Sequence, residues 1–181
     1  MTKGASTKEV LLTHACRLFW SRGYSNVSVR EVAKAAGVDV ALIARYYGSK
    51  LGLFEATLET LEKLDPTAFP NADALIDTIV ELFANAPDGH GEASPVSLIL
   101  MNAGDPEVGQ LVTEGQNECW QKPMEEIIGS KSRAAVFFAA ILGFSVVQKM
   151  MHMEGIAVPG SKEHRAQLRH VLKSALESPE V

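Results

Sequence analysis

Residues 28–50 read SVREVAKAAGVDVALIARYYGSK, and this stretch decides the fold of the N-terminal part. Ser28 and Glu31 form a capping box, which satisfies free amide groups at the start of a helix. Gly37 ends that helix because glycine adopts a left-handed backbone at little cost. Asp39 can cap a third short helix. Helices joined in this way have the dimensions of a helix-turn-helix, whose second helix enters the DNA major groove. Other helix pairs share this spacing, so it does not decide the function alone.

The flanking segments extend this unit to four helices. STKE at 6–9 is another capping box, and Gly23 ends the first helix near Arg22. After Gly48, a connecting helix is expected over about 49–64. The residues expected to face inward are Leu11, Ala15, Leu18, Phe19, Val32, Ala33, Ala36, Leu42, Ile43, Leu53, Phe54, Leu58 and Leu61.

The whole chain is predicted to be all-α. Helical periods dominate after a linker at 65–70, and no segment shows convincing strand-like alternation. Pro123 should kink the helix that contains it because proline has no amide hydrogen. The expected helices occupy about 72–86, 95–102, 106–128, 131–154 and 162–177.

Charge is divided unequally along the chain. The 181 residues carry a net charge of −5, but residues 1–50 hold eight basic and three acidic side chains, so the remainder is −10. A basic head on an acidic body is expected of a DNA-binding protein. The start of the chain lacks a secretory signal, and the apolar run at 134–147 is shorter than the roughly 20 residues that cross a membrane. We therefore expect a cytoplasmic protein that does not contact a membrane.

Six short motifs occupy the first 50 residues in a definite order: TKEVL, ACRLF, GY, SVREVA, AGV and YYGSK. In order and spacing they resemble the signature of the TetR family of transcriptional regulators. The resemblance implies a helix-turn-helix DNA-binding domain over 1–50 and a helical ligand-binding and dimerisation domain over 65–181. It implies a repressor that binds a palindromic operator, a double-stranded DNA, as a homodimer. A small apolar inducer would release it.

The resemblance, carried over position by position, assigns DNA binding to seven residues. They are Ser28, Arg30, Val40, Ala41, Arg45, Tyr46 and Lys50. Arginine can contact guanine edges, Val and Ala can contact thymine methyl groups, and a helix N-terminus such as that at Lys50 attracts phosphate. The less favoured alternative for each arginine is a solvated surface charge. Ala44 replaces a tyrosine that usually reaches the DNA backbone, so Tyr46 or Arg45 is expected to compensate.

The two C-terminal helices are expected to form the homodimer interface. The helix at about 131–154 is apolar nearly all round, and one chain can cover only part of it. The helix at 162–177 carries an apolar stripe, with Arg165, Arg169 and Lys173 outside it. The stripe consists of Leu168, Val171, Leu172, Ala175 and Leu176. The alternative is that both helices only close the core of one chain.

An apolar ligand pocket is expected between these helices and those of 72–128, because methionine and aromatic side chains suit adaptable cavities. Its candidate residues, for each of which core packing is the alternative, are Phe83, Leu98, Met101, Trp120, Phe137, Phe138 and Phe144.

Other signals predict no enzyme, metal site or cofactor. MMHM at 150–153 places only two methionines on one helix face, and GHG at 89–91 is a loop rather than a phosphate-binding motif. His164 and His170 are expected at the surface. Two other functions stay open: an interaction protein with degenerate DNA binding, and a thiol-based redox-sensing regulator that uses Cys16 or Cys119.

Overall fold

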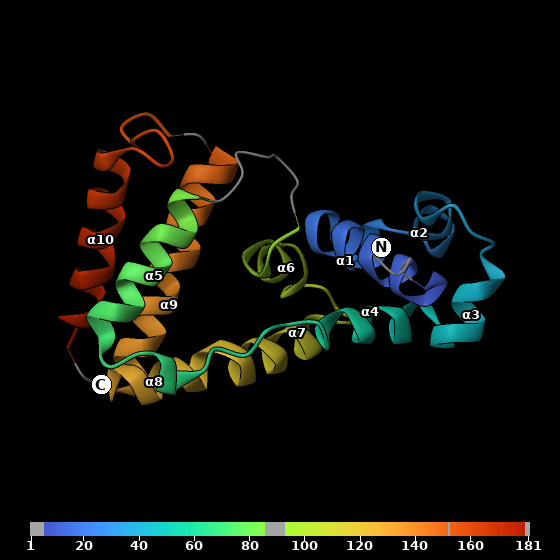
Figure 1. Cartoon of the computed structure of the whole chain (residues 1–181), viewed down its shortest axis with the longest axis horizontal. Coiled ribbons are helices and arrows are strands. Elements are labelled where there is room, and N and C mark those ends of the chain that lie inside the picture. Colours follow the sequence, from blue (N-terminus) through green and yellow to red (C-terminus); the bar gives the residue numbers. More distant parts are fainter. Residues whose placement is uncertain (1–5, 86–92, 152, 180–181) are drawn as a thin grey trace, which may run out of the picture. The chain divides into compact units, whose positions relative to one another are not determined.

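The computed structural model describes residues 6–85, 93–151 and 153–179, and the regular secondary structure of these residues is helical (Figure 1). The chain divides into two compact units. The first comprises Met1–Glu62 and Gly91–Gln116, and the second comprises Lys63–His90 and Asn117–Val181. The GHG motif at 89–91 and His152 of the MMHM motif lie outside the described residues.

The helices of the first unit begin where the capping residues predict. Ser6 and Ser28 each accept a hydrogen bond from the amide three residues later, and both capping boxes are complete. Gly23 and Gly37 end the first two helices with positive φ angles of 87° and 69°. The unit contains α1 (Thr7–Arg22), the 3-10 helix η1 (Tyr24–Asn26), α2 (Val29–Ala36), α3 (Ala41–Tyr47), α4 (Lys50–Leu58), α6 (Pro95–Asn102) and α7 (Gly109–Gln116).

Helix α4 is shorter than the predicted helix at 49–64, and two threonines explain its end. The Thr57 hydroxyl donates to the Phe54 carbonyl at 2.6 Å, and the Thr60 hydroxyl donates to the Thr57 carbonyl at 2.7 Å. Such side-chain bonds compete with the helical backbone pattern. The next amides accordingly bond three residues back, as in Leu61 to Leu58.

Helices α6 and α7 pack within the first unit rather than with the remainder of the C-terminal part. Helix α6 contacts α1, and α7 contacts α4. The core of the unit includes an aromatic cluster in which the ring centroids of Phe19, Tyr24 and Phe54 lie 5.2 to 5.7 Å apart. The two compact units therefore do not coincide with the two functional domains expected to meet near residue 65. The division into functional domains stays a prediction.

The helix predicted at 106–128 is interrupted. It begins at Gly109, and a π-helical segment, Asn117–Gln121, precedes α8 (Lys122–Ile128). Pro123 has no amide hydrogen for the Cys119 carbonyl four residues earlier. That carbonyl accepts the Leu64 amide at 2.9 Å. A π-helical segment thus precedes Pro123, and the expected kink stays a prediction.

The second unit is organised around three helices that run side by side (Figure 1). They are α5 (Ala72–Ala84), α9 (Lys131–Val146) and α10 (Lys162–Leu176); a short 3-10 helix, Pro66–Ala68, precedes α5. A π-helical segment, Val147–Met151, follows α9, so the regular helix is shorter than the predicted 131–154. The fully buried residues of the unit include Ile76, Val80, Phe137, Leu168 and Leu172.

Two expectations for α10 are wrong. His164, expected at the surface, is fully buried, and its Nε2 lies 3.1 Å from Oε1 of Gln148. Leu168 and Leu172, expected in the seam between two chains, are fully buried within their own unit. The reason is that α10 packs on both α5 and α9, which together cover this face.

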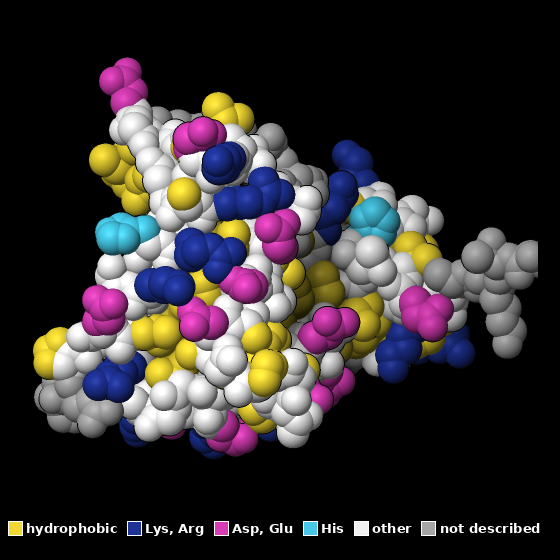
Figure 2. Space-filling model, turned by 60° about the vertical axis from the view of Figure 1, so that its left-hand side comes forward, with side chains coloured by type: hydrophobic (Ala, Val, Ile, Leu, Met, Phe, Trp, Pro, Cys, Tyr) yellow, Lys and Arg dark blue, Asp and Glu magenta, His cyan; other side chains and the backbone are white. Residues whose placement is uncertain are grey.

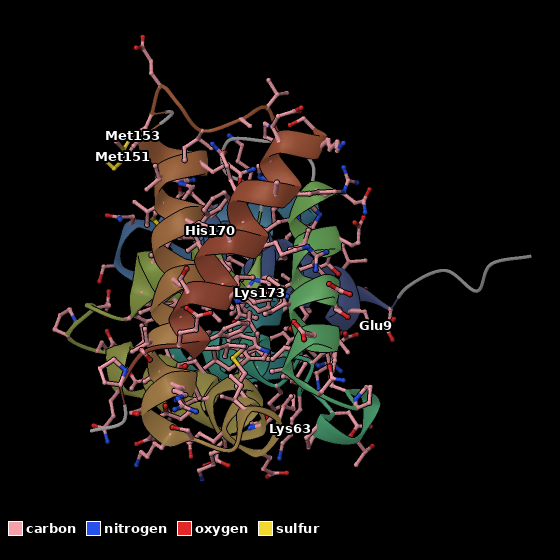
Figure 3. The ribbon with its side chains drawn as sticks, turned by 90° about the vertical axis from the view of Figure 1, so that its left-hand side faces the viewer. Glu9, Lys63, Met151, Met153, His170 and Lys173 are labelled. Atoms are coloured by element: carbon pink, nitrogen blue, oxygen red, sulfur yellow. The ribbon has the colours of Figure 1, made fainter. Side chains whose placement is uncertain are left out.

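A ladder of ion pairs joins α5 to α10 on the surface of the second unit. Arg165 pairs with Glu81 at 3.0 Å, Lys173 pairs with Asp73 at 3.1 Å, and Arg169 pairs with Asp77 between them. The three acidic residues are spaced four apart on α5, and the three basic residues are spaced four apart on α10, so each set lies along one side of its helix. Basic and acidic side chains alternate on this face in Figure 2, and Figure 3 shows Lys173 where α10 runs beside α5. The basic residues expected outside the apolar stripe thus have acidic partners.

Within the described ranges, no helix has the length and apolar character that crossing a membrane requires. The same ranges contain no group of three or more His, Cys, Asp or Glu side chains that could hold a metal ion.

Candidate nucleic-acid interface

The turn between α2 and α3 holds the two helices in a fixed relation. Gly37 is left-handed, and the Val38 amide donates to the Ala33 carbonyl at 3.0 Å. Ala33 and Ile43 are each 2% exposed, so one side of both helices is buried in the unit. The N-cap of α3 is Val40 rather than the predicted Asp39, but the Asp39 carboxylate accepts the Ala41 amide at 2.7 Å and so still supports the start of the helix.

The seven residues expected at DNA all lie in the first unit, and solvent reaches each of them. Ser28, Arg30, Val40, Ala41 and Arg45 are exposed, whereas Tyr46 and Lys50 are half-buried. Val40, at the N-cap of α3, is 40% exposed, so its side chain is accessible to a binding partner. Ala44, at the position where a tyrosine is usual, is also exposed.

Lys50 is the first residue of α4, and its surroundings are closely defined. The Ser49 hydroxyl caps the helix by accepting the Gly52 amide at 2.9 Å. A Cβ atom at Gly52 would collide with the Tyr47 carbonyl oxygen, so this glycine permits the tight entry into α4. Lys50 Nζ lies 4.0 Å from the ring centroid of Tyr24. The sequence motifs include Tyr24 only as part of GY, without a role, and do not include Gly52, because both contacts depend on tertiary packing.

The two adjacent tyrosines of α3 have different roles. The Tyr47 hydroxyl donates to the Lys8 carbonyl at 2.6 Å and ties α3 to the start of α1. Tyr46 is stacked near Arg45, whose guanidinium carbon lies 5.8 Å from the ring centroid. The Tyr46 hydroxyl does not tie α3 to α1 as the Tyr47 hydroxyl does. Tyr46 therefore suits the expected role of contacting the DNA backbone in place of the tyrosine that Ala44 replaces.

Arg22, another arginine near the helix-turn-helix, forms an ion pair within the protein. Arg22 pairs with Glu31 at 3.1 Å. Hydrogen bonds from Ser28, and then the Arg22 guanidinium, lower the pKa of Glu31. Its carboxylate therefore stays ionised and serves the capping box of α2.

The seven residues expected at a ligand pocket are divided between the units. Leu98 and Met101 lie on α6 in the first unit, whereas the aromatic candidates lie in the second. Phe83 and Phe144 form an edge-to-face pair with centroids 6.3 Å apart, and Phe137 is fully buried. The remaining aromatic candidates, Trp120 and Phe138, are half-buried. A groove on α1, lined by residues that include Leu12, Cys16 and Trp20, contains none of the seven.

Neither cysteine is activated for thiol chemistry. Burial is the largest effect on both thiols, and it raises the pKa of Cys16 and of Cys119 above the usual value. Because the thiolate is the reactive form, a raised pKa disfavours a redox-sensing role.

The N-terminal region is similar in sequence to known regulatory proteins. Residues 11–57 match the family described as bacterial regulatory proteins, tetR family. A 50-residue stretch is 48% identical to a probable HTH-type transcriptional regulator, YttP, of Bacillus subtilis (strain 168). That match covers 28% of this chain and 24% of the relative, so it concerns about a quarter of the relative's length.

The fold of nearly the whole chain is similar to that of solved structures. NalD, the secondary repressor of the MexAB-OprM multidrug efflux pump in Pseudomonas aeruginosa, superposes with a TM-score of 0.65 at 19% identity, over 94% of this chain and 95% of that one. A mutant of HlyIIR superposes with a TM-score of 0.59 at 18% identity, over 97% and 98% of the two chains. At these identities the similarity concerns the fold.

Proposed function

Through its N-terminal helix-turn-helix this chain belongs to the TetR family of bacterial regulatory proteins, and we propose that it is a repressor that binds a palindromic operator as a homodimer. A small apolar inducer releases it from DNA. The observation that carries the proposal is the set of exposed residues on α2 and α3, continued by Lys50 at the start of α4.

The proposed DNA surface combines charge with small apolar groups. Arg30 and Arg45 supply donors for base edges or phosphates, and Val40 and Ala41 supply contacts for thymine methyl groups. Lys50 supplies a phosphate contact. The net charge of +5 over residues 1–50, against −10 over the remainder, favours approach of this end to DNA.

The proposed dimer interface lies on the parts of α9 and α10 that their own unit leaves uncovered. Val136 is 43% exposed and Val171 is 37% exposed, while Ala139 and Gly143 continue the exposed side of α9. A Cβ atom added to Gly143 would meet no atom within 4 Å, so another helix could approach here closely. Two such helix pairs form a four-helix interface, and Figure 3 shows α9 and α10 side by side.

The proposed inducer is apolar because the candidate residues supply aromatic and methionine side chains. The Phe83–Phe144 pair and half-buried Phe138 offer ring surfaces within the second unit. An inducer acts only if it binds the released conformation better than the DNA-bound one. A 10- to 100-fold loss of operator affinity needs a coupling of about 1.4–2.8 kcal/mol.

Selection from a randomised DNA duplex tests DNA binding. We expect enrichment of an inverted repeat with half-sites one helical turn apart, about 34–36 Å, because a two-fold dimer places its recognition helices in successive major grooves. The affinity for the selected duplex should fall steeply with salt. If no duplex is enriched and binding to DNA is not salt-dependent, the chain is an interaction protein and the proposal fails.

Induction is tested separately on the selected operator. Apolar compounds that raise the unfolding temperature of the full chain are added at saturation, and operator affinity is measured in the wild type and in Phe138→Trp. The wild type should lose affinity, and the variant, whose proposed cavity is partly filled, should respond less. Unchanged operator affinity with a compound shown to bind the second unit would refute induction but not DNA binding.

A further inference from the structure

Tyr24 lies at the point where η1 follows α1, and it joins several parts of the first unit. Its side chain is 3% exposed and packs against Phe19 and Phe54. The Lys50 ammonium lies over its ring, 4.0 Å from the centroid. That distance is well within the range of a favourable cation–π interaction.

The corner between α6 and α7 holds Tyr24 from the other side. Asn102 is fully buried, and its Oδ1 accepts the Tyr24 amide at 2.6 Å. The Asn102 side-chain nitrogen donates to the carbonyls of Phe19 at 3.1 Å and Leu98 at 2.9 Å. The Tyr24 hydroxyl donates to Glu107 at 2.8 Å. Main chain and side chain of Tyr24 are thus both fixed by this corner.

The protonation of Tyr24 agrees with a donor role. Burial first, and then the hydrogen bond and negative charge of Glu107, raise the pKa of the phenol well above its usual value. The hydroxyl therefore keeps its proton at any physiological pH. The ring stays neutral, with the negative face that attracts a cation.

Lys50 needs such a support because of its place in α4. It is the first residue of the helix, where the positive end of the helix dipole disfavours a cation. A lysine side chain also has many rotamers, and ordering it on binding costs entropy. An aromatic face under the ammonium offsets the dipole and reduces the number of rotamers before DNA arrives.

We propose that Tyr24 is a positioning residue for DNA binding: its ring, held by Asn102 and Glu107, keeps the Lys50 ammonium in place for a DNA phosphate. The inference rests on the proposed DNA-binding function. It assigns to the α6–α7 corner an influence on a phosphate contact that acts through Tyr24 and Lys50, although no residue of the corner need touch DNA.

A double-mutant cycle on the full chain tests this role, with a short mixed-sequence duplex as the probe. Tyr24→Leu removes the ring, and Lys50→Ala removes the ammonium. We expect Tyr24→Leu to weaken DNA binding about two- to five-fold, the change that a lost cation–π contact produces. The slope of log affinity against log salt should fall by up to about one, as for a lost phosphate contact. In the Lys50→Ala background, Tyr24→Leu should have no further effect on either quantity.

Lys34→Ala is the matched control, because Lys34 is an exposed lysine of α2 in the same unit. In that background Tyr24→Leu should keep its full effect. An equal effect of Tyr24→Leu in all three backgrounds, or no effect on the salt slope, overturns the proposal and leaves Tyr24 a core residue only.

Tyr24→Phe keeps the test open if Tyr24→Leu does not fold, since it retains the ring and loses only the bond to Glu107. It should preserve the salt slope, and the Lys50 methylene protons should show an upfield ring-current shift by NMR in both the wild type and Tyr24→Phe. Absence of that shift, or a salt slope reduced in Tyr24→Phe as much as in Lys50→Ala, refutes the positioning role. If the wild type binds no DNA while the ring-current shift is present, the proposed function has failed and the placement of Lys50 has not.

Discussion

The Leu64 amide donates a hydrogen bond to the Cys119 carbonyl oxygen at 2.9 Å. In a regular α-helix this carbonyl would accept the amide of residue 123, but that residue is Pro123, which has no amide hydrogen. A residue of the segment after α4 thus completes the backbone bonding of a helix far along the chain. Because a buried or helical carbonyl without a donor is costly, this bond fixes the segment before α5 to the second unit.

We predict from this relationship that the Leu64 amide is protected from hydrogen exchange although it lies outside a helix. Pro123→Ala supplies a new amide four residues after Cys119, which competes for the same carbonyl. The exchange rate of Leu64 should then rise by about tenfold or more. Hydrogen exchange followed by NMR measures this, with the Lys63 amide as the neighbouring control. Equal exchange of Leu64 in the wild type and in Pro123→Ala would contradict the prediction.

Arg45→Ala tests base recognition by α3. Arg45 is exposed and is held near Tyr46 rather than in an ion pair. Its loss should cost about 1–3 kcal/mol of operator affinity and relax the preference at the contacted base pair. Arg22→Ala is the control, because Arg22 is also exposed but pairs with Glu31. The assignment of Arg45 is wrong if both variants change base preference equally.

Local sequence signals predict where a helix begins and ends better than they predict which other helices it contacts. Ser28, Glu31 and Gly37 act within a few residues of themselves, so their roles follow from spacing alone. The end of α4 depends on Thr57, whose hydroxyl also accepts the Trp20 indole from α1 at 3.1 Å. Such a pairing across 37 residues leaves no periodic signal in the sequence.

The same limit applies to the candidate site. The family resemblance assigns Lys50 to DNA contact, and the Ser49 cap that places it at the start of α4 is visible in the sequence. Its neighbour Tyr24 is 26 positions away, and only folding brings the ring under the ammonium. The burial of His164 was missed for the related reason that α10 has neighbours on two sides rather than one.

Asp77 and Arg169, the middle pair of the α5–α10 ladder, should couple the two helices weakly but measurably. Reversing one charge, as in Arg169→Asp, places like charges together and should lower the unfolding temperature. The double variant Asp77→Arg with Arg169→Asp should recover most of the loss. The coupling is expected at about 0.2–1 kcal/mol at low salt and should shrink at high salt, because both side chains are exposed. Additive effects of the two substitutions would mean that the pair does not interact.

Glu81 and Arg165, the next pair of the ladder, predict how stability depends on pH. The hydrogen bond from Arg165 is the largest of the effects that together lower the pKa of Glu81 below its ordinary value of 4.5. A lowered folded pKa means that the stabilisation is fully present above pH 4.5 and is lost as pH falls through the lowered pKa. Arg165→Gln should therefore lower the unfolding temperature at neutral pH and reduce its decline in acid. Thermal unfolding of both proteins between about pH 2 and 7 measures this, and parallel curves would contradict it.

Val171 and Leu172 are adjacent on α10, and together they separate assembly from folding. Val171 is 37% exposed and lies on the proposed dimer face, whereas Leu172 is fully buried within its own unit. Val171→Glu places a charge between two chains, so we expect at least about a tenfold weaker dimer, or ~1.4 kcal/mol, with little change in helical content. Leu172→Glu buries an unpaired charge and should unfold the second unit instead. Sedimentation velocity gives the oligomeric state, and circular dichroism gives the helical content. A wild type that stays monomeric at micromolar concentration, or a Val171→Glu variant that dimerises like the wild type, would show that α10 does not join two chains through this face.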